Sequence, residues 1–147
     1  INEITGDVVL SPILYNKMVI DNKFLDTLLE QAANSERKRT AFDMRTTSSD
    51  NSQRIINAMM PETIVPIHRH TKTSESMTVL RGKLTEIFFD DNGCETARFE
   101  LGPSTGNIMI QIPAGTWHTV EVNEPCVIFE AKDGAYEPVA PEDVMQR

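Results

Sequence analysis

The chain has 147 residues, with 14 basic and 22 acidic residues and a net charge of −8 at neutral pH. A surface this acidic argues against nucleic acid and against an anionic membrane as partners. No segment is apolar over the length of a membrane-spanning helix, and Ile1–Leu10 lacks the features of a secretory signal. We therefore expect a cytoplasmic protein of one domain.

One amphipathic helix is predicted near the N-terminus, ending at about residue 33. Asp21 can cap its first turn, and Ile20 and Leu25 stand at the two positions of a hydrophobic staple. One apolar stripe runs along it: Phe24, Leu25, Leu28, Leu29 and Ala32. Such a stripe packs against the domain or against a second subunit, and with the N-terminal arm it predicts a homodimer. The charged run that follows, residues 35–39, is expected to be a solvated connection, with binding of an anionic ligand as the alternative.

From residue 40 onward the pattern changes to short β-strands. The predicted strands cover residues 41–45, 53–60, 65–70, 75–81, 83–90, 94–101, 108–112, 117–122 and 127–132. Asn92-Gly93 predicts a hairpin turn, because this pair suits positive φ. Many short strands after a single helix indicate an all-β sandwich or barrel. We expect an N-terminal arm and helix over residues 1–40, a barrel over 41–135 and an irregular tail over 136–147.

The two cysteines, Cys94 and Cys126, lack the spacing of a metal site. We expect reduced, packed thiols, as in most cytosolic proteins. They are poor candidates for a nucleophile, because no histidine remains free to activate them.

All three histidines fall in two short segments that together predict one metal site. His68 and His70 flank Arg69 in an extended stretch, so they point to one face while Arg69 points away and is expected to be structural. Glu75 begins the next β-rich run, and His118 follows a Pro-x-Gly turn. Three imidazoles and one carboxylate are a full ligand set for one divalent transition metal such as Zn, Ni, Fe or Mn. The alternative is that these are surface or core histidines unrelated to a metal.

A metal held by these four side chains carries a local charge near +1 and keeps one or two positions open. Such a site attracts a small anionic or sugar-like ligand through an oxygen atom. Met77 and Val79 alternate with Glu75, which predicts a largely apolar pocket wall. Six further residues are candidates for contacts to this ligand, although each type is more often found in surface ion pairs. They are Arg54, Asn57, Arg81, Lys83, Glu130 and Tyr136.

These segments resemble the two motifs of the cupin superfamily. Residues 68–82 match the first motif from its His-x-His pair to Gly82, and residues 113–118 match the second from its Pro to its His. The resemblance implies a cupin double-stranded β-helix, a jelly-roll barrel, here with one N-terminal α-helix. It also implies the metal ligands His68, His70, Glu75 and His118.

A closer resemblance, over about residues 19–138, is to the WbuC-type cupin metalloproteins. It is carried by the initial helix and by residues 37–39, 53–58, 80–82, 89–93, 112–119 and 132–136. That family is associated with gene clusters for bacterial O-antigen and other surface polysaccharides. The resemblance implies a metal-binding cupin that acts on a sugar or sugar-derived molecule in this biosynthesis, with the metal as Lewis acid. An isomerase, epimerase or lyase, an Fe(II) dioxygenase, and a non-catalytic saccharide-binding module all remain open.

Overall fold

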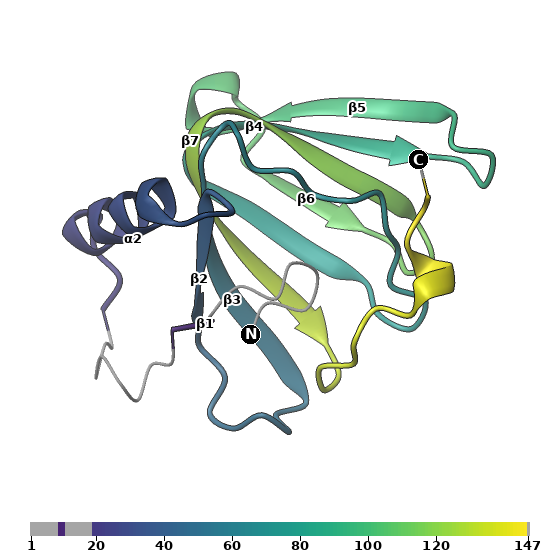
Figure 1. Cartoon of the computed structure of the whole chain (residues 1–147), viewed down its shortest axis with the longest axis horizontal. Coiled ribbons are helices and arrows are strands. Elements are labelled where there is room, and N and C mark those ends of the chain that lie inside the picture. Colours follow the sequence, from purple (N-terminus) through teal and green to yellow (C-terminus); the bar gives the residue numbers. More distant parts are fainter. Residues whose placement is uncertain (1–8, 11–18, 147) are drawn as a thin grey trace.

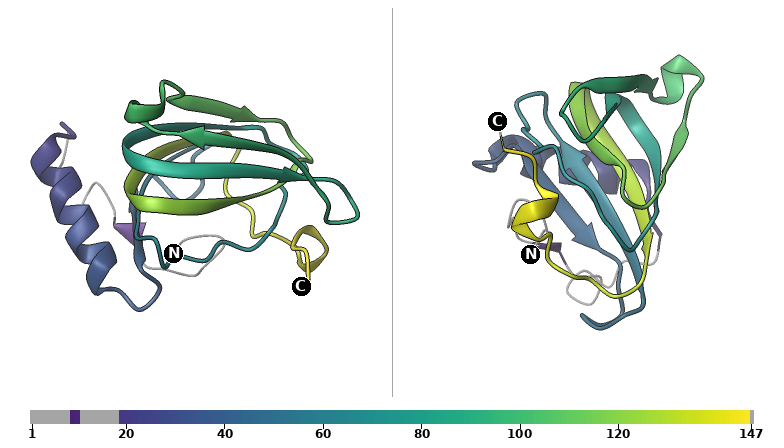
Figure 2. Two further views of the ribbon diagram at one scale, coloured as in Figure 1. Left: turned by 90° about the horizontal axis from the view of Figure 1, so that it is seen from above. Right: turned by 90° about the vertical axis from the view of Figure 1, so that its right-hand side faces the viewer.

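The computed structural model describes residues 9–10 and 19–146 (Figure 1). Its elements are β1 (Val9–Leu10), α2 (Asn22–Asn34), β2 (Arg39–Asp43), β3 (Ser52–Met59), β4 (Glu75–Phe89), β5 (Glu95–Leu101), η1 (Pro103–Thr105), β6 (Met109–Ile112), β7 (Trp117–Asp133) and η2 (Pro141–Asp143). Seven strands form one sheet in the order β1-β2-β3-β7-β4-β5, with β6 paired to β4. Figure 2 shows this sheet curling on itself, with α2 outside it and the C-terminal segment at the opposite end.

Two long strands, β4 and β7, pair antiparallel along almost their whole lengths. The sequence predicted two separate strands within each of them, and this division is wrong. The register shifts between Val79 and Leu84, and Gly82 at this bend has a φ of +83°. A Cβ on Gly82 would lie 2.1 Å from the carbonyl oxygen of Pro125. The ladder therefore bends through β-bulges without breaking, and the same two strands serve both ends of the barrel.

The predicted helix is present as α2 and has the predicted cap. The Asp21 carboxylate accepts a hydrogen bond of 2.9 Å from the backbone N–H of Phe24. The apolar stripe packs on the outer face of the sheet, against Phe42, Ile56 and Val127 among others. The stripe is therefore buried within its own chain and no longer argues for a second subunit. The homodimer stays a prediction.

Replacing Asp21 with Ala should lower the free energy of unfolding by about 1 kcal/mol, because the Phe24 N–H loses its acceptor. Chemical denaturation measures this change. Thr27→Ala is the matched control, since its hydroxyl is exposed on the same helix, and it should alter stability by less than about 0.5 kcal/mol. An equal loss in both variants would contradict a capping role for Asp21.

The interior of the barrel changes from apolar to charged along its length. On β7 the inward positions Cys126 and Ile128 belong to an apolar cluster, whereas the next two, Glu130 and Lys132, are polar and line a cavity. Both cysteines are free, as expected, but only Cys126 is buried; Cys94 is exposed, so the expectation of a packed thiol is wrong there. None of the helices in residues 9–10 and 19–146 has the length and apolar character needed to cross a bilayer. The segment Ile1–Leu10, examined above for a secretory signal, lies mostly outside the described residues.

Candidate metal centre

The three histidines come together at the charged end of the barrel. One ring nitrogen from each of His68, His70 and His118 lies within 4.8 Å of those of the other two. The predicted strand over 65–70 is absent as a regular strand; His68 instead forms isolated bridges to His118 and Val144. The His68 and His118 backbones donate to each other's carbonyl oxygens at 3.1 and 2.9 Å. This mutual pairing holds two of the three rings side by side, with centroids 4.3 Å apart.

Two of the rings are oriented by the backbone just before them. Nδ1 of His68 lies 2.8 Å from the Pro66 carbonyl oxygen, and Nδ1 of His118 lies 2.8 Å from that of Thr116. A carbonyl can only accept, so each neutral ring carries its hydrogen on Nδ1 and keeps a lone pair on Nε2. Metal-binding histidines commonly have this arrangement, in which the far nitrogen is held by a backbone carbonyl.

Burial keeps these rings uncharged. It is the main cause that lowers the pKa of His68 well below its usual value and the pKa of His118 to about 4. The charge of His118 lowers the pKa of His68 further, and the charge of His70 acts in the same direction on His118. The rings are therefore neutral near pH 7, which is the form that binds a metal.

The side chain of Glu75, the first residue of β4, points toward the histidine cluster. Its Oε1 lies 3.5 Å from Nε2 of His70, 4.0 Å from Nε2 of His118 and 3.9 Å from Nζ of Lys132, its partner across the ladder. Burial and the neighbouring carboxyls Glu130 and Glu86 raise the pKa of Glu75 well above its usual value. The structure thus brings together all four side chains that the sequence predicted as ligands.

The donor atoms of this cluster fit a cation. Among the described residues, Nε2 of His70, Nε2 of His118 and Oε1 of Glu75 are buried without a hydrogen-bond partner. Buried polar atoms rarely lack a partner, and one divalent ion would satisfy all three lone pairs. Donors at about 2.1 Å from one ion lie at most about 4.2 Å apart, so the triad needs only a small contraction to bind it. The buried histidine triad can therefore hold a metal.

Contacts from the C-terminal tail stabilise the segment that carries His68 and His70. Nε of Arg69 pairs with Oδ1 of Asp143 at 2.8 Å, and its guanidinium lies 4.4 Å from the centre of the Trp117 ring. The backbone of Met145 donates to the Ile67 carbonyl oxygen at 2.8 Å. The structural role predicted for Arg69 is confirmed.

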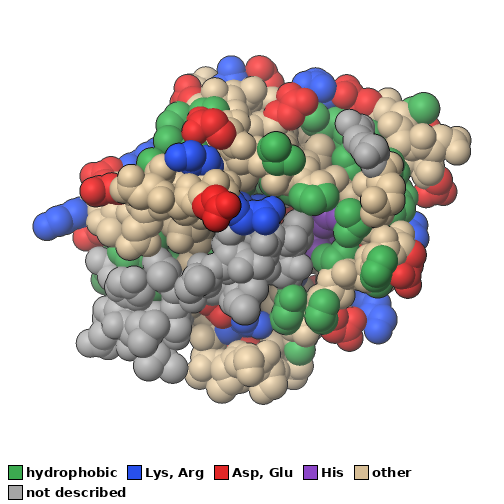
Figure 3. Space-filling view, in the orientation of Figure 1, with side chains coloured by type: hydrophobic (Ala, Val, Ile, Leu, Met, Phe, Trp, Pro, Cys, Tyr) green, Lys and Arg blue, Asp and Glu red, His purple; other side chains and the backbone are tan. Residues whose placement is uncertain are grey.

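Two hollows adjoin the triad. A cavity of about 40 Å³ inside the barrel is lined by His68, Glu75 and His118 and by four further charged residues, Arg39, Glu86, Glu130 and Lys132. A larger hollow of about 550 Å³, with His70 on its wall, opens between residues 69–73 and the tail. Figure 3 shows histidine atoms at the surface within a hollow, so the triad is not sealed from solvent.

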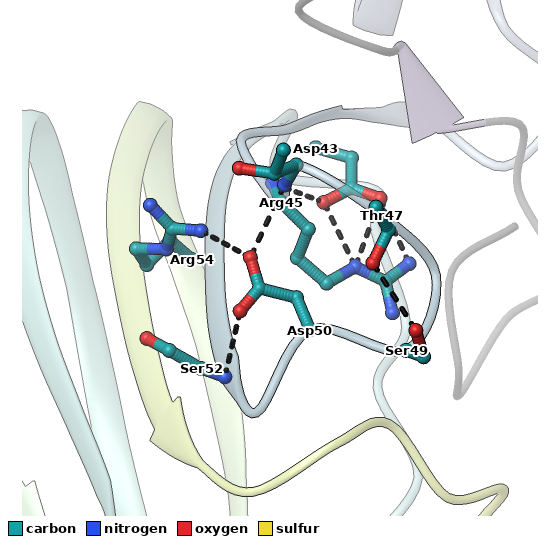
Figure 4. Close-up of polar contacts among 8 residues, drawn as sticks. Asp43, Arg45, Thr47, Ser49, Asp50, Ser52 and Arg54 are labelled. Atoms are coloured by element: carbon teal, nitrogen blue, oxygen red, sulfur yellow. Dashed lines mark hydrogen bonds and ion pairs between the residues drawn. The ribbon is translucent and has the colours of Figure 1, made fainter.

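Of the six predicted ligand contacts, two lie within the barrel. Glu130 lines the cavity. Asn57 is 1% exposed, accepts a hydrogen bond of 3.3 Å from Arg39 and hydrogen-bonds Glu130. Arg54 lies on the other face of β3, as the spacing required, and pairs there with Asp50 at 2.6 Å (Figure 4).

The remaining three also lie away from the cavity. Arg81 bonds Asp26 and the Asn22 carbonyl oxygen, and so ties α2 to β4. Lys83 pairs with Glu100 at 3.5 Å. The ring of Tyr136 lies 5.8 Å from the guanidinium of Arg45, whose other partner is Asp43. Like Arg54, these side chains are held by other partners and do not line the cavity beside the triad.

Sequence reasoning missed three charged residues of the cavity: Arg39, Glu86 and Lys132. Arg39 ends the run that was expected to be solvated, yet it starts β2 and is 5% exposed, so that expectation is wrong at this residue. Glu86 alternates with Leu84 and Phe88 along the strand. A charged residue on an otherwise apolar strand face was the signal that could have identified it. Lys132 stands two residues after Glu130 and shares its face.

The cavity residues have shifted acid–base properties because they are buried. Burial, followed by the nearby Glu130, raises the pKa of Glu86 well above its usual value. Burial also raises the pKa of Glu130, although the charge of Arg39 and the hydrogen bond from Asn57 act against this. Burial lowers the pKa of Lys132 to about 7.

The shift of Glu86 predicts that its own contribution to the stability of the metal-free protein falls as the pH rises. The Glu86 carboxyl ionises near pH 4.5 in the unfolded chain but keeps its proton to higher pH when folded. Its stabilising contribution is therefore present below pH 4.5 and lost as the pH rises toward the folded pKa. Glu86→Gln should flatten this dependence by up to about 1.4 kcal/mol per pH unit.

Chemical denaturation of both proteins from about pH 5 to about pH 8 measures this effect. The other titrating groups of the cavity, among them His68, His118, Glu75, Glu130 and Lys132, are present in both proteins. The difference therefore reports the loss of the Glu86 carboxyl, including its effect on the pKa of Glu75. Parallel stability curves would contradict the expected titration.

The model of the family described as "Domain of unknown function (DUF6016)" matches residues 20–101, more than half of the chain. The chain belongs to this family. The match includes His68, His70 and Glu75 and ends before His118. No curated protein matches the sequence.

Solved structures show the fold of this DUF6016 protein. The capsular polysaccharide assembling protein CapF from Staphylococcus aureus is 20% identical, with a TM-score of 0.59, over 76% of this chain and 32% of that chain. L-ribose isomerase from Cellulomonas parahominis is 17% identical, with a TM-score of 0.51, over 62% of this chain and 52% of that one. The conserved SPY1581 protein of unknown function from Streptococcus pyogenes is 10% identical, with a TM-score of 0.56, over 82% and 90% of the two chains.

These likenesses show that the fold is the predicted cupin jelly roll, with one α-helix among the described residues. At such identities they show the fold alone. The chain also spans only about a third of the CapF chain.

Proposed function

We propose that this cupin binds one divalent transition metal through His68, His70, Glu75 and His118. We further propose that it acts there on a sugar or sugar-derived acid in the formation of a bacterial surface polysaccharide. The observation that carries the proposal is that three buried donor atoms without a hydrogen-bond partner among the described residues meet beside a cavity. The likeness to CapF and the resemblance to WbuC-type cupins support the polysaccharide context.

Each part of the site has a separate role in this proposal. A bound divalent ion supplies Lewis-acid chemistry at an oxygen of the ligand. The Pro66 and Thr116 carbonyls keep the Nε2 lone pairs of His68 and His118 directed at the ion. The cavity of about 40 Å³ admits only a small part of a ligand. A larger saccharide would then lie in the outer hollow beside His70.

A non-catalytic binding module is the second candidate. All three histidines belong to the triad, which leaves no histidine to act as a general base. The cavity still contains Lys132, whose amine lies 3.9 Å from Glu75 and can serve as a proton donor beside the triad, and this favours an enzyme.

Metal analysis of protein purified without chelators and without a nickel column tests the first part. We expect about one transition-metal ion per chain. Thermal-shift measurements with nucleotide sugars and sugar acids, on metal-loaded and metal-free protein, test the second part. We expect stabilisation by a ligand only when the metal is present. Protein that takes up no metal even after soaking would refute the proposal, and equal stabilisation of both forms would refute the role of the metal in ligand binding.

A further inference from the structure

One carboxyl group inside the barrel lacks a hydrogen-bond partner among the residues that the structure describes. The Glu86 side chain on β4 lines the same cavity as His68 and His118, and the residue is 1% exposed. Neither of its two carboxyl oxygens has a hydrogen-bond partner among the described residues. A carboxyl group buried in this way lowers the stability of the fold, so its position calls for a reason other than packing.

The other two carboxyls of the cavity differ from Glu86. Glu75 lies within 4.0 Å of His70, His118 and Lys132. Glu130 receives a hydrogen bond from the Asn57 amide. Of the three, only Glu86 has both carboxyl oxygens buried with no hydrogen-bond partner among the described residues.

We infer that Glu86 is a second anchor of the ligand site, and that its carboxyl binds a hydroxyl group of a small hydroxy acid. The carboxylate of that acid faces the triad of His68, His70 and His118. This inference rests on the proposed function, because it assumes a metal at the triad, and it narrows the ligand to one chemical class.

The charges and the size of the cavity select this class. Arg39 lines it, and the proposed divalent ion adds further positive charge, so an amine ligand is opposed and an anionic one is favoured. Burial raises the pKa of Glu86 and so favours its protonated form, which offers one donor and one acceptor, as a hydroxyl does. A water molecule needs about 10–15 Å³ of such space. The cavity of about 40 Å³ therefore admits a group of only a few atoms.

Acetate and glycolate, which differ by one hydroxyl, test the inference. Dissociation constants of both are measured by the visible absorption of Co²⁺-loaded protein, for the wild type and for Glu86→Met, Glu86→Gln and Thr85→Val. We expect the wild type to bind glycolate more tightly than acetate. In Glu86→Met the ratio of the two dissociation constants should fall about tenfold, because one hydrogen bond is lost. Glu86→Gln, which keeps a donor and an acceptor, should retain most of the preference for glycolate.

Thr85→Val is the matched control on the same strand. The Thr85 hydroxyl bonds Asn123 and the residue does not line the cavity, so its loss should leave the preference unchanged. Each variant is also assayed for bound Co²⁺, which should stay at the wild-type level. If Glu86→Met folds, binds Co²⁺ and keeps the full glycolate preference, the inference is overturned while the proposed function stands. Wild-type protein that binds no Co²⁺ overturns both.

Discussion

Replacing His118 with Ala should weaken the affinity for a divalent transition metal by more than about 100-fold. Loss of a partner behind a metal ligand already costs about 10–100-fold, and His118 is itself a proposed ligand. Its ring stands closest to that of His68, and its Nε2 is buried without a hydrogen-bond partner among the described residues. The substitution removes one of three imidazoles and leaves Glu75 beside a single close histidine, His70.

Elemental mass spectrometry measures the metal content after dialysis, and competition against a chelator measures the affinity. Lys72→Ala is the control, because Lys72 is an exposed residue on the outer hollow and lies outside the cluster. Its affinity should equal that of the wild type. A His118→Ala protein that is folded by circular dichroism and keeps full metal content would remove His118 from the ligand set.

Replacing Gly82 with Ala should destabilise the barrel by about 2–5 kcal/mol. A φ of +83° costs a residue with a Cβ about 1–2 kcal/mol. The new Cβ would also lie 2.1 Å from the Pro125 carbonyl oxygen and 2.8 Å from Cα of Cys126, both backbone atoms of β7. The ladder between β4 and β7 must shift to relieve this contact, which adds about 1–3 kcal/mol.

Gly106→Ala separates these two causes. Gly106 has the same φ of +83°, and nothing lies within 4 Å of a Cβ built there. This control should lose only about 1–2 kcal/mol. In thermal denaturation, the melting temperature should fall by about 5–15 °C in Gly82→Ala and by a few degrees in Gly106→Ala. Similar losses in the two variants would show that the close approach of β7 has little effect.

The local patterns of the sequence were enough to predict several parts of the molecule. Asp21 and the apolar stripe after it predicted α2, because capping and helical periodicity involve residues only three or four apart. Asn92-Gly93 predicted the turn between β4 and β5, where Gly93 has a φ of +81°. The motif spacing predicted His68, His70, Glu75 and His118, and the structure places them together.

Only the tertiary structure decided which charged side chains face the inside of the barrel. Strand alternation tells which residues share a face, but it does not tell which face is enclosed when both are covered. Thr85 and Glu86 are both buried, yet only Glu86 lines the cavity. Arg54 and Arg81 looked equally suited to bind a ligand, and their partners Asp50 and Asp26 hold them outside it.

The sequence by itself therefore determined the ligand set proposed for the metal and the class of fold, because both depend on residue types at short, regular spacings. The tertiary structure decided the shape of the barrel and the charges within it. Those depend on contacts between β4 and β7, whose paired residues lie far apart in the chain. Glu86 on β4 and Arg39 on β2 line one cavity with His68 and His118 although they lie far apart in the chain, so only the folded barrel brings them together.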